Sequence, residues 1–337
     1  MKKNLSILKK IKNYLKKDDI YRFQALQTSI DELNRKISLL EEDNNRILSN
    51  LSNSTNVIND RISSSAMGIE NRVLPVIQGI SSFCMNEYLI RQGTEKDNII
   101  FDYYNQLHNI LRCYRPIGAK YTRIGRHHDG GYVMLQPLSE NKIAYSFGIC
   151  DDVSWDLDIA NEGYEIYQYD HTICELPENN QSFHWQKLGL TGGKETDELK
   201  NIETILINNN HIDCEGMLLK VDIEGCEWDF INSCDSGILA KFDQIVMEMH
   251  SLSDFYDRER KLSALRKLAK THALVSVHGN NYRRVVYSGN CVTPDVIEVT
   301  LVNRLKYELK EDEGIIFPSA LDENNFTEEQ DIIIGKW

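Results

Sequence analysis

The sequence predicts an α/β fold: a largely parallel sheet with helices on both faces, preceded by an N-terminal helical coiled coil. Three observations carry this prediction. From about residue 120, short apolar runs alternate with amphipathic stretches, which is the pattern of strands and helices that follow one another. Runs such as 217–221 are apolar almost throughout, and strands of this kind are buried on both faces of a parallel sheet. Before residue 63, a heptad repeat predicts the coiled coil.

The second part of the chain is expected to alternate between strands and helices. The strands are predicted at 143–148, 164–169, 183–188, 217–222, 244–249, 273–278 and 295–303. The helices are predicted at 153–162, 195–208, 226–240 and 254–270. Only a loop separates the last two strands, which indicates a terminal antiparallel pair. Before the first strand, Asp129-Gly130-Gly131 predicts a hairpin turn, because these residues readily adopt positive φ.

The N-terminal coiled coil is predicted over residues 20–62. Apolar residues recur there in alternating steps of three and four, with one asparagine at a core position. The seam consists of Phe23, Leu26, Ile30, Leu33, Ile37, Leu40, Asn44, Ile47 and Leu51. A seam of this kind faces a partner helix, and a buried asparagine can fix register, so we expect a homo-oligomer. The alternative is one long amphipathic helix that packs on its own domain.

Two further segments flank the predicted coiled coil. Residues 1–17 contain seven lysines and no acidic residue, with apolar residues at helical spacing. This segment is either an amphipathic helix that contacts an anionic membrane surface or a solvated basic helix end. Residues 63–115 are expected to form a helical connector. The chain therefore divides into a basic helix and stalk at 1–62, the connector at 63–115 and the globular domain at 116–337.

The composition argues against several classes of protein. The net charge of −13 disfavours a nucleic-acid binder, which needs a basic face to neutralise phosphates. The eight cysteines form no C-x-x-C pair, so we expect reduced thiols in a cytoplasmic protein and no zinc site. No stretch approaches 18 consecutive apolar residues, and the N-terminus lacks the apolar core of a secretory signal. We therefore expect neither a transmembrane helix nor a signal peptide.

The first candidate site follows two strands, at the edge where open α/β sheets bind ligands. The first strand ends at Gly148, where a glycine lets the backbone approach a cofactor, and Asp151 and Asp152 come just before the next helix. This turn has only one glycine, which disfavours pyrophosphate binding. The second strand ends before Asp170 and His171, and Asp170 lies 22 residues after Gly148. An acid at this spacing can bind a ribose diol; the alternative is a turn or helix-cap residue.

The second candidate site consists of carboxylates and histidines that follow later strands. Asp222 and Glu224 come at the end of one strand, two residues apart, so we expect both to line the pocket. His250 and His278 follow the next two strands and are expected to face these carboxylates as an acid/base cluster. The same four residues could instead bind a divalent metal such as Mn, Fe or Zn.

The most specific motif is the stretch 220–228. It reads Lys-Val-Asp-Ile-Glu-Gly-Cys-Glu-Trp and resembles the K-[IV]-D-[IV]-E-G-x-E-[WLY] signature of FkbM-like methyltransferases. Supporting segments lie in order at 129–132, 145–149, 170–171 and 278–281. The resemblance covers roughly residues 120–302. Bacterial members of this group are often associated with the synthesis of capsule or other surface glycans.

The resemblance implies a class I, Rossmann-like fold of six parallel strands and one antiparallel strand, with S-adenosylmethionine as cofactor. It also implies methyl transfer to oxygen. By position, it places Gly148 and Asp170 at the cofactor and Asp222 between cofactor and acceptor; Asp151, Asp152 and His171, which lie beside them in the sequence, complete the candidate cofactor site. Cys150 and the two aspartates after it stand where the family often has a second glycine.

The predicted function is O-methylation of a sugar or capsular-polysaccharide precursor by an oligomeric cytoplasmic enzyme. The basic N-terminus leaves open a peripheral contact with the inner membrane. His250 or His278 is the candidate base for the acceptor hydroxyl, beside Asp222 and Glu224. A phosphoramidate-type capsule substituent or a lipid-linked precursor would also suit such an enzyme as acceptor. The alternatives are a nicotinamide-dependent oxidoreductase, which the missing pyrophosphate glycines disfavour, a metal-dependent hydrolase and a non-catalytic coiled-coil scaffold.

Overall fold

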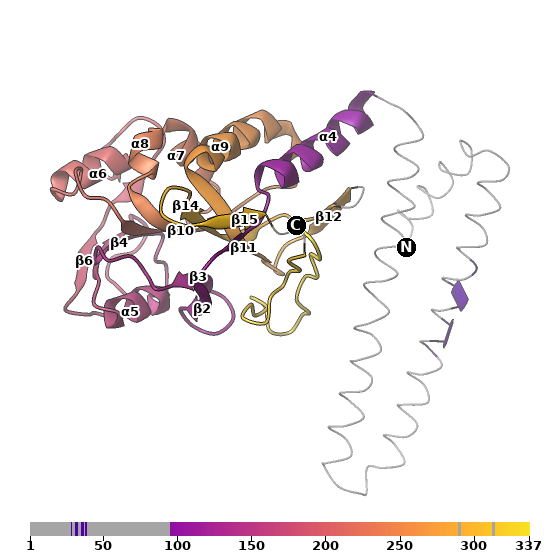
Figure 1. The fold of residues 1–337 in the computed structure, drawn as a ribbon, viewed down its shortest axis with the longest axis horizontal. Helices are drawn as coiled ribbons and strands as arrows, with labels where there is room; N and C mark the ends of the chain where they lie inside the picture. Colours follow the sequence, from indigo (N-terminus) through magenta and orange to yellow (C-terminus); the bar gives the residue numbers. More distant parts are fainter. Residues whose placement is uncertain are drawn as a thin grey trace, which may run out of the picture. The chain divides into compact units, whose positions relative to one another are not determined.

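The computed structural model describes residues 95–288, 291–311 and 314–337, together with six isolated positions between 28 and 38 (Figure 1). The chain divides into two units, Met1–Asp97 and Asn98–Trp337. The predicted seam, the basic segment 1–17 and most of the connector lie outside the described residues. The six isolated positions are helical and exposed, and Glu32 and Lys36 form an ion pair of 3.2 Å one helical turn apart.

A seven-stranded sheet forms the centre of the second unit. Its order is β11-β14-β10-β9-β4-β5-β6. The bounds are β4 Ile143–Phe147, β5 Glu165–Tyr169, β6 Phe183–Gln186, β9 Met217–Val221, β10 Phe242–Met249, β11 His272–Gly279 and β14 Ile297–Asn303. Every predicted strand is present, and the six-plus-one arrangement is confirmed. The antiparallel strand β14 is inserted between β10 and β11 and pairs with both.

Helices cover both faces of this sheet, as predicted (Figure 1). One face carries α4 Glu95–Ile110, α6 Ile202–Asn208, α7 Glu227–Ser233, α8 Ser236–Leu239 and α9 Arg258–Thr271, the last preceded by a 3-10 turn at Phe255–Asp257. The other face carries α5 Ser154–Asn161 and the hairpin of β2 Lys120–Ile124 and β3 Tyr132–Gln136. The single helix expected at 226–240 is in fact two helices. Cys234 is extended (φ −63°, ψ 135°), and Asp235 then caps α8 by accepting the Gly237 N–H at 2.7 Å.

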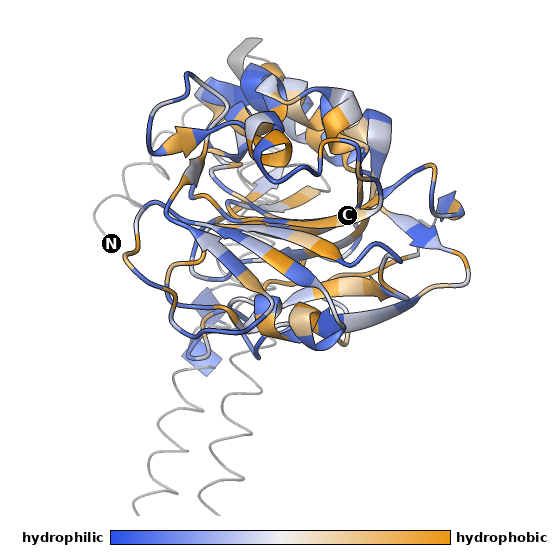
Figure 2. Ribbon diagram, turned by 90° about the vertical axis from the view of Figure 1, so that its left-hand side faces the viewer, coloured by the Kyte–Doolittle hydropathy of each residue, from blue (hydrophilic) through white to orange (hydrophobic). Residues whose placement is uncertain are grey.

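The two largest apolar clusters, one on each side of the sheet, stabilise these layers. The larger cluster includes Tyr103 and Leu107 of α4, so this helix belongs to the core of the globular unit from residue 98 onward. The smaller one packs Trp155 and Ile159 of α5 against Met134 of the hairpin. Figure 2 shows the apolar residues gathered on the central strands and on the inner sides of the helices. Burial of this kind is the main favourable contribution to folding.

Several short elements were not predicted. They are β1 Tyr114–Pro116 with β15 Leu309–Glu311, β7 Gly189–Leu190 with β8 Leu199–Lys200, and β12 Val285–Ser288 with β13 Cys291–Pro294. One of them, β8, occupies part of the helix expected at 195–208, which begins only at Ile202. The C-terminal segment, residues 314–337, is anchored near both ends. Phe317 and Gly335 form a backbone bridge, and the Trp337 indole donates to the Leu111 carbonyl at 3.0 Å.

The strand order places the site. From β4 the sheet continues through β5 on one side and β9 on the other, so strand order reverses at β4. Ligands in such sheets bind beyond the carboxyl ends of the strands at this switch point.

None of the helices in the described part of the chain is long and apolar enough to cross a membrane.

Candidate active site

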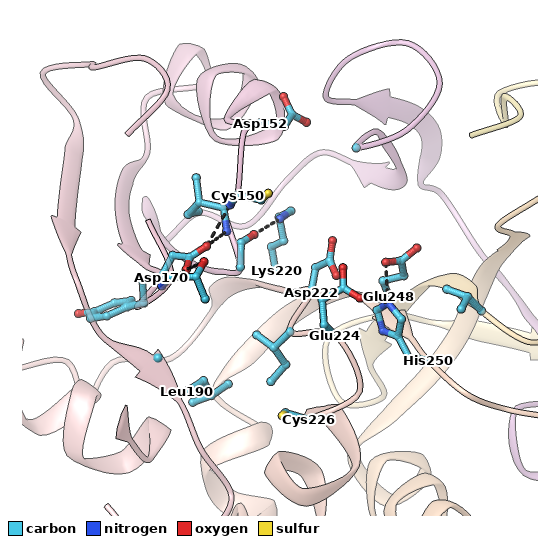
Figure 3. A pocket seen from close by; sticks show the side chains of 18 of the residues that line it. Cys150, Asp152, Asp170, Leu190, Lys220, Asp222, Glu224, Cys226, Glu248 and His250 are labelled. Carbon is cyan, nitrogen blue, oxygen red and sulfur yellow. Dashed lines mark hydrogen bonds and ion pairs between the residues drawn. The ribbon is translucent and has the colours of Figure 1, made fainter. Parts of the chain in front are cut away.

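A cavity of about 920 Å³ opens at the carboxyl ends of β4, β5, β9 and β10 (Figure 3). Of the predicted site residues, those that line it are Gly148, Asp151, Asp152, Asp170, His171, Asp222, Glu224 and His250. His278 does not line it. We call the end formed by Gly148, Cys150 and Asp170 the glycine-turn end. The acidic end is formed by Glu224, Glu248 and His250; Figure 3 shows Asp222 beside them, on the side that faces Lys220.

The glycine turn requires a residue without a side chain. Gly148 has φ +81°, and a Cβ built there would lie 1.6 Å from the carbonyl oxygen of Asp222. The Gly148 N–H donates to the Tyr169 carbonyl at 3.1 Å, and its own carbonyl accepts from Lys220 Nζ at 2.9 Å. The end of β4 is therefore pressed against the end of β9, and the turn presents bare backbone to the cavity.

Asp170 braces this turn. Its Oδ2 accepts the N–H groups of Ile149 at 2.9 Å and Cys150 at 3.0 Å. Its Oδ1 accepts from the Thr172 N–H at 2.8 Å and hydroxyl at 2.6 Å. Burial raises the pKa of Asp170, but these hydrogen bonds together outweigh it and hold the pKa below its ordinary value. A carboxylate has about four acceptor positions, and all are in use here. Both oxygens of Asp170 therefore hold the turn, and the expectation that this residue binds a ribose diol stays a prediction.

The other predicted residues of this end lie at the entrance to α5 or at the rim. Asp152 accepts the Ser154 N–H at 3.0 Å and the Ser154 hydroxyl at 2.9 Å, which satisfies a free donor at the start of α5. Its other contact is an ion pair with Arg126 at 3.4 Å. Asp151 and His171 are exposed at the rim of the cavity.

Asp222 lies between the two ends of the cavity. It follows the buried strand β9, and its Oδ1 is buried with no hydrogen-bond partner among the described residues. Burial and then the negative charge of Glu248 raise the pKa of Asp222 to about 7, against the opposing charges of Lys220 and His250. This carboxyl group can therefore gain or lose a proton near neutral pH.

The turn after Asp222 sends the next acidic side chain outward. Glu224 and Gly225 have φ of +54° and +97°, and the Glu224 side chain is 80% exposed. Glu227, which is fully buried, accepts the N–H groups of Ile223 at 3.2 Å and Gly225 at 3.1 Å. The two carboxylates expected to act together therefore differ: Asp222 faces the interior, and Glu224 lies at the mouth.

His250 is surrounded by carboxylates. Its Nδ1 lies 3.1 Å from Glu227, and its Nε2 lies 3.1 Å from Glu248 and 3.4 Å from Glu224. Burial lowers the pKa of His250, but hydrogen bonds to Glu227 and Glu248 outweigh it and raise the pKa to about 11. Asp222, Glu224 and His250 each offer one potential metal-ligand atom, and these three atoms lie within 4.8 Å of one another, a spacing that a cation could bridge. At a pKa of about 11 the His250 ring is protonated near neutral pH, and its positive charge offsets part of the acidic charge.

His278 lies behind the cavity wall. Its Nδ1 lies 2.9 Å from Glu298, and its Nε2 lies 2.9 Å from Asp331 of the C-terminal segment. Burial lowers the pKa of His278, whereas hydrogen bonds to Asp331 and Glu298 raise it to about 10. Both candidate histidines are therefore protonated near neutral pH, and neither has a free nitrogen with which to accept a proton.

The charge of His278 predicts a pH-dependent stability. Its folded pKa of about 10 lies above the ordinary value of about 6.5. Its contribution is therefore full below pH 6.5 and is lost as the pH rises through 10. We expect His278→Gln to lower the free energy of unfolding by about 3 kcal/mol at pH 7, because it leaves Glu298 and Asp331 unpaired. Urea unfolding of both proteins at pH 7 and pH 10 measures this; a difference that does not shrink at pH 10 would contradict the charged state.

Several lining residues escaped the sequence prediction, among them Arg126, Lys220, Tyr282 and Glu298. Glu298 was detectable in principle. It lies near the start of the antiparallel strand β14, and that end of β14 meets the carboxyl ends of its neighbours. Glu298 pairs in register with Glu248 on one side and His278 on the other.

The sheet has seven strands and is mostly parallel, and the cavity lies at the glycine turn after β4. Together with the family model that matches this part of the chain, these features identify a Rossmann-like methyltransferase. More specifically, residues 114–277 match the family model of the methyltransferase FkbM domain, so this part of the chain is an FkbM-like methyltransferase domain. The match ends within β11 and does not reach β14 or the C-terminal segment.

Two other comparisons add no functional argument. No curated protein matches the chain. Among solved structures, a similar chain is titled "Putative hemolysin from Streptococcus thermophilus". It is 10% identical, the similarity covers 52% of this chain and 72% of that chain, and the TM-score is 0.29. A similarity of this size carries no inference about function.

Proposed function

We propose that this domain transfers a methyl group from S-adenosylmethionine to a hydroxyl group of a sugar or capsular-polysaccharide precursor. The FkbM-like domain supports methyl transfer. The observation that supports transfer to a hydroxyl group is the position of Asp222. Its carboxyl group is buried between the glycine-turn end and the acidic end and has a pKa of about 7.

The residues of the glycine-turn end fit S-adenosylmethionine. Gly148 and Gly192 both line the cavity, and a Cβ at Gly192 would lie 2.0 Å from the Asp229 carbonyl oxygen. At both places another stretch of backbone leaves no room for a side chain, so the cavity wall there consists of main chain, along which a ligand can lie. Bound S-adenosylmethionine supplies an electrophilic methyl group on a positively charged sulfur. The turn braced by Asp170, the segment 189–193 and Asp222 would hold it.

Asp222 replaces the two histidines as the proposed base. A sugar hydroxyl is a weak acid, so a group that accepts its proton as the methyl bond forms lowers the barrier. A carboxylate with a pKa near 7 is ionised in about half of the molecules at neutral pH, and it can accept the proton directly. The imidazolium of His250 lies beside this carboxylate and partly offsets the negative charge of Glu248, which favours the ionised form of Asp222.

Titration calorimetry tests the cofactor. The full chain is expected to bind S-adenosylhomocysteine and not NAD, because the turn after β4 lacks the further glycines of a pyrophosphate site. Transfer of a labelled methyl group to a sugar-precursor pool then tests the acceptor. Binding of NAD, or the absence of S-adenosylhomocysteine binding, would contradict the proposal.

We also propose that the protein is a cytoplasmic homo-oligomer held by residues 20–62, with a basic N-terminus that can contact the inner membrane. The heptad seam and the seven lysines of residues 1–17 support these proposals. A monomeric mass for the full chain in light scattering would contradict the first, and equal binding to anionic and neutral vesicles would contradict the second.

A further inference from the structure

We propose that Asp129, Tyr282 and Glu298 form a saccharide subsite in the cavity, and that the C-terminal segment, residues 314–337, holds it in shape. The proposal rests on the proposed function, since it concerns how the acceptor is bound. It goes further by assigning the acceptor's recognition to residues that lie largely outside the FkbM match, which ends at residue 277.

Tyr282 lies on the cavity wall with part of its side chain accessible. It lines the cavity and is 55% exposed, so a ligand in the cavity can contact its ring. Its ring packs on Phe326 of the C-terminal segment, with centroids 4.9 Å apart. Its backbone N–H donates to Asn280 Oδ1 at 3.0 Å. The ring is therefore supported from behind, and its open face can pack against the C–H face of a pyranose.

Two carboxylates stand in the same wall at fixed positions. Asn325 of the C-terminal segment, which is buried, donates from Nδ2 to Glu298 Oε1 at 2.5 Å and to Asp129 Oδ1 at 2.9 Å. The His278 imidazolium holds the other oxygen of Glu298 at 2.9 Å. Each carboxylate oxygen can accept a further hydrogen bond. Sugar hydroxyls are the donors that such a pair of oriented carboxylates would bind at the edge of a ring.

The C-terminal segment is tied to this wall by several polar contacts. The Asn281 amide donates to the carbonyls of Phe326 at 3.0 Å and Gln330 at 3.2 Å, and its oxygen accepts the Phe326 N–H at 2.7 Å. Asp331 forms a hydrogen bond with Nε2 of the His278 ring, and Nδ1 of the same ring forms one with Glu298. Asp331 therefore acts on the subsite through His278, as a positioning residue and without touching the sugar.

An apolar ring face beside carboxylates matches a pyranose better than a small polyol. A pyranose offers a flat C–H face and several edge hydroxyls, so it can use Tyr282 and Glu298 at once. Glycerol offers neighbouring hydroxyls without a ring face. The difference in affinity between a pyranose and glycerol therefore measures the contribution of the Tyr282 ring.

Saturation-transfer NMR on the full chain with saturating S-adenosylhomocysteine tests the subsite. The probes are the methyl glycosides of glucose, galactose, mannose and N-acetylglucosamine, with glycerol for comparison. We expect at least one glycoside to bind at millimolar concentration and to compete with the others, with glycerol at least about tenfold weaker. No glycoside binding, or equal binding of glycerol, would overturn the proposal.

Two variants, each with a matched control, locate the bound sugar. Tyr282→Ala and Glu298→Gln are expected to weaken glycoside affinity at least about tenfold. Tyr256→Ala removes a tyrosine that is 83% exposed and does not line the cavity. Glu328→Gln removes an exposed carboxylate of the C-terminal segment that does not line the cavity. Both controls are expected to leave the affinity unchanged. Equal losses in variants and controls would contradict the assignment.

Asp331→Asn tests the positioning role. We expect weaker glycoside binding, unchanged S-adenosylhomocysteine affinity and a lower pKa of His278, followed through its ring nitrogen shifts. A fully retained glycoside affinity with a lowered His278 pKa would overturn the role of Asp331. S-Adenosylhomocysteine binding separates the two proposals: its absence in the wild-type chain counts against the methyl-transfer function, whereas its presence without glycoside binding counts against the subsite alone.

Discussion

Asp222→Asn is expected to slow methyl transfer by about 10²–10⁴-fold, the range that a positioned proton acceptor contributes. Asparagine has nearly the same shape as aspartate, and Asp222 Oδ1 makes no hydrogen bond with the described residues. The substitution therefore removes the ionisable group with little change in packing. It also removes a buried negative charge that lies beside Glu248, so the fold is not expected to lose stability.

The pH dependence of the rate follows from the same group. Only the ionised form of Asp222 accepts a proton, and its pKa is raised to about 7. The wild-type kcat/KM is therefore expected to rise about tenfold per pH unit below pH 7 and to level off above it. The apparent pKa belongs to Asp222 and Glu248 together, because the two charges interact. Steady-state rates between pH 5 and pH 9 measure this profile.

Asp213→Asn is the matched control for this prediction. Asp213 is exposed on the loop after α6 and does not line the cavity, so its variant should keep the wild-type rate and profile. S-Adenosylhomocysteine affinity should change little in either variant. A wild-type rate in the Asp222→Asn enzyme would show that Asp222 is not the base. If kcat/KM of this variant still rose with pH as in the wild type, another group would be responsible for the rise.

Gly148→Ala has the second large expected effect, a loss of S-adenosylhomocysteine affinity of about 100-fold, which corresponds to about 2.8 kcal/mol. The added Cβ would lie 1.6 Å from the Asp222 carbonyl oxygen, so either the turn or the end of β9 must move. The positive φ of +81° adds strain for any residue with a side chain. Because the turn itself faces the cavity, displacement changes the surface that the ligand contacts. Calorimetric titration measures the affinity.

Gly163→Ala separates strain from overlap. Gly163, just after α5, has φ +84°, but an added Cβ would meet nothing within 4 Å. It should cost about 1–2 kcal/mol of folding stability through backbone strain alone and leave the ligand affinity intact. Gly148→Ala should cost about 1–3 kcal/mol more in unfolding experiments, because overlap is added to strain. Equal losses in both variants, with S-adenosylhomocysteine affinity retained in both, would show that the turn does not bind the cofactor.

Much of the fold could be predicted because its signals are local. A buried parallel strand must be apolar on both faces, so β9 and β10 were visible as apolar runs. The split between α7 and α8 was missed because it depends on one extended residue, Cys234, within an amphipathic pattern that continues across it. The hairpin of β12 and β13 was missed because its strands are short and only partly buried.

The site was predicted in place but only partly in role. Residues that follow parallel strands must meet at one edge of the sheet, which is why Gly148, Asp222 and His250 all line one cavity. Their chemical roles depend on neighbours from distant parts of the chain. Asp170 has its acceptor positions filled by the turn that it braces. His250 is charged because three carboxylates surround it.

The sequence by itself determined the α/β class, the seven strands, the motif around Asp222 and the edge of the sheet at which the cavity lies. The burial of a strand and the place where it ends depend on the residues of that short stretch alone, so both can be predicted from a single sequence. Only the tertiary structure decided that β14 lies between β10 and β11 and that residues 314–337 return to the cavity wall. It also decided that Asp222 is about half-ionised and His278 charged at pH 7. Protonation follows from burial and from charges brought together through space, and no local pattern in the chain encodes it.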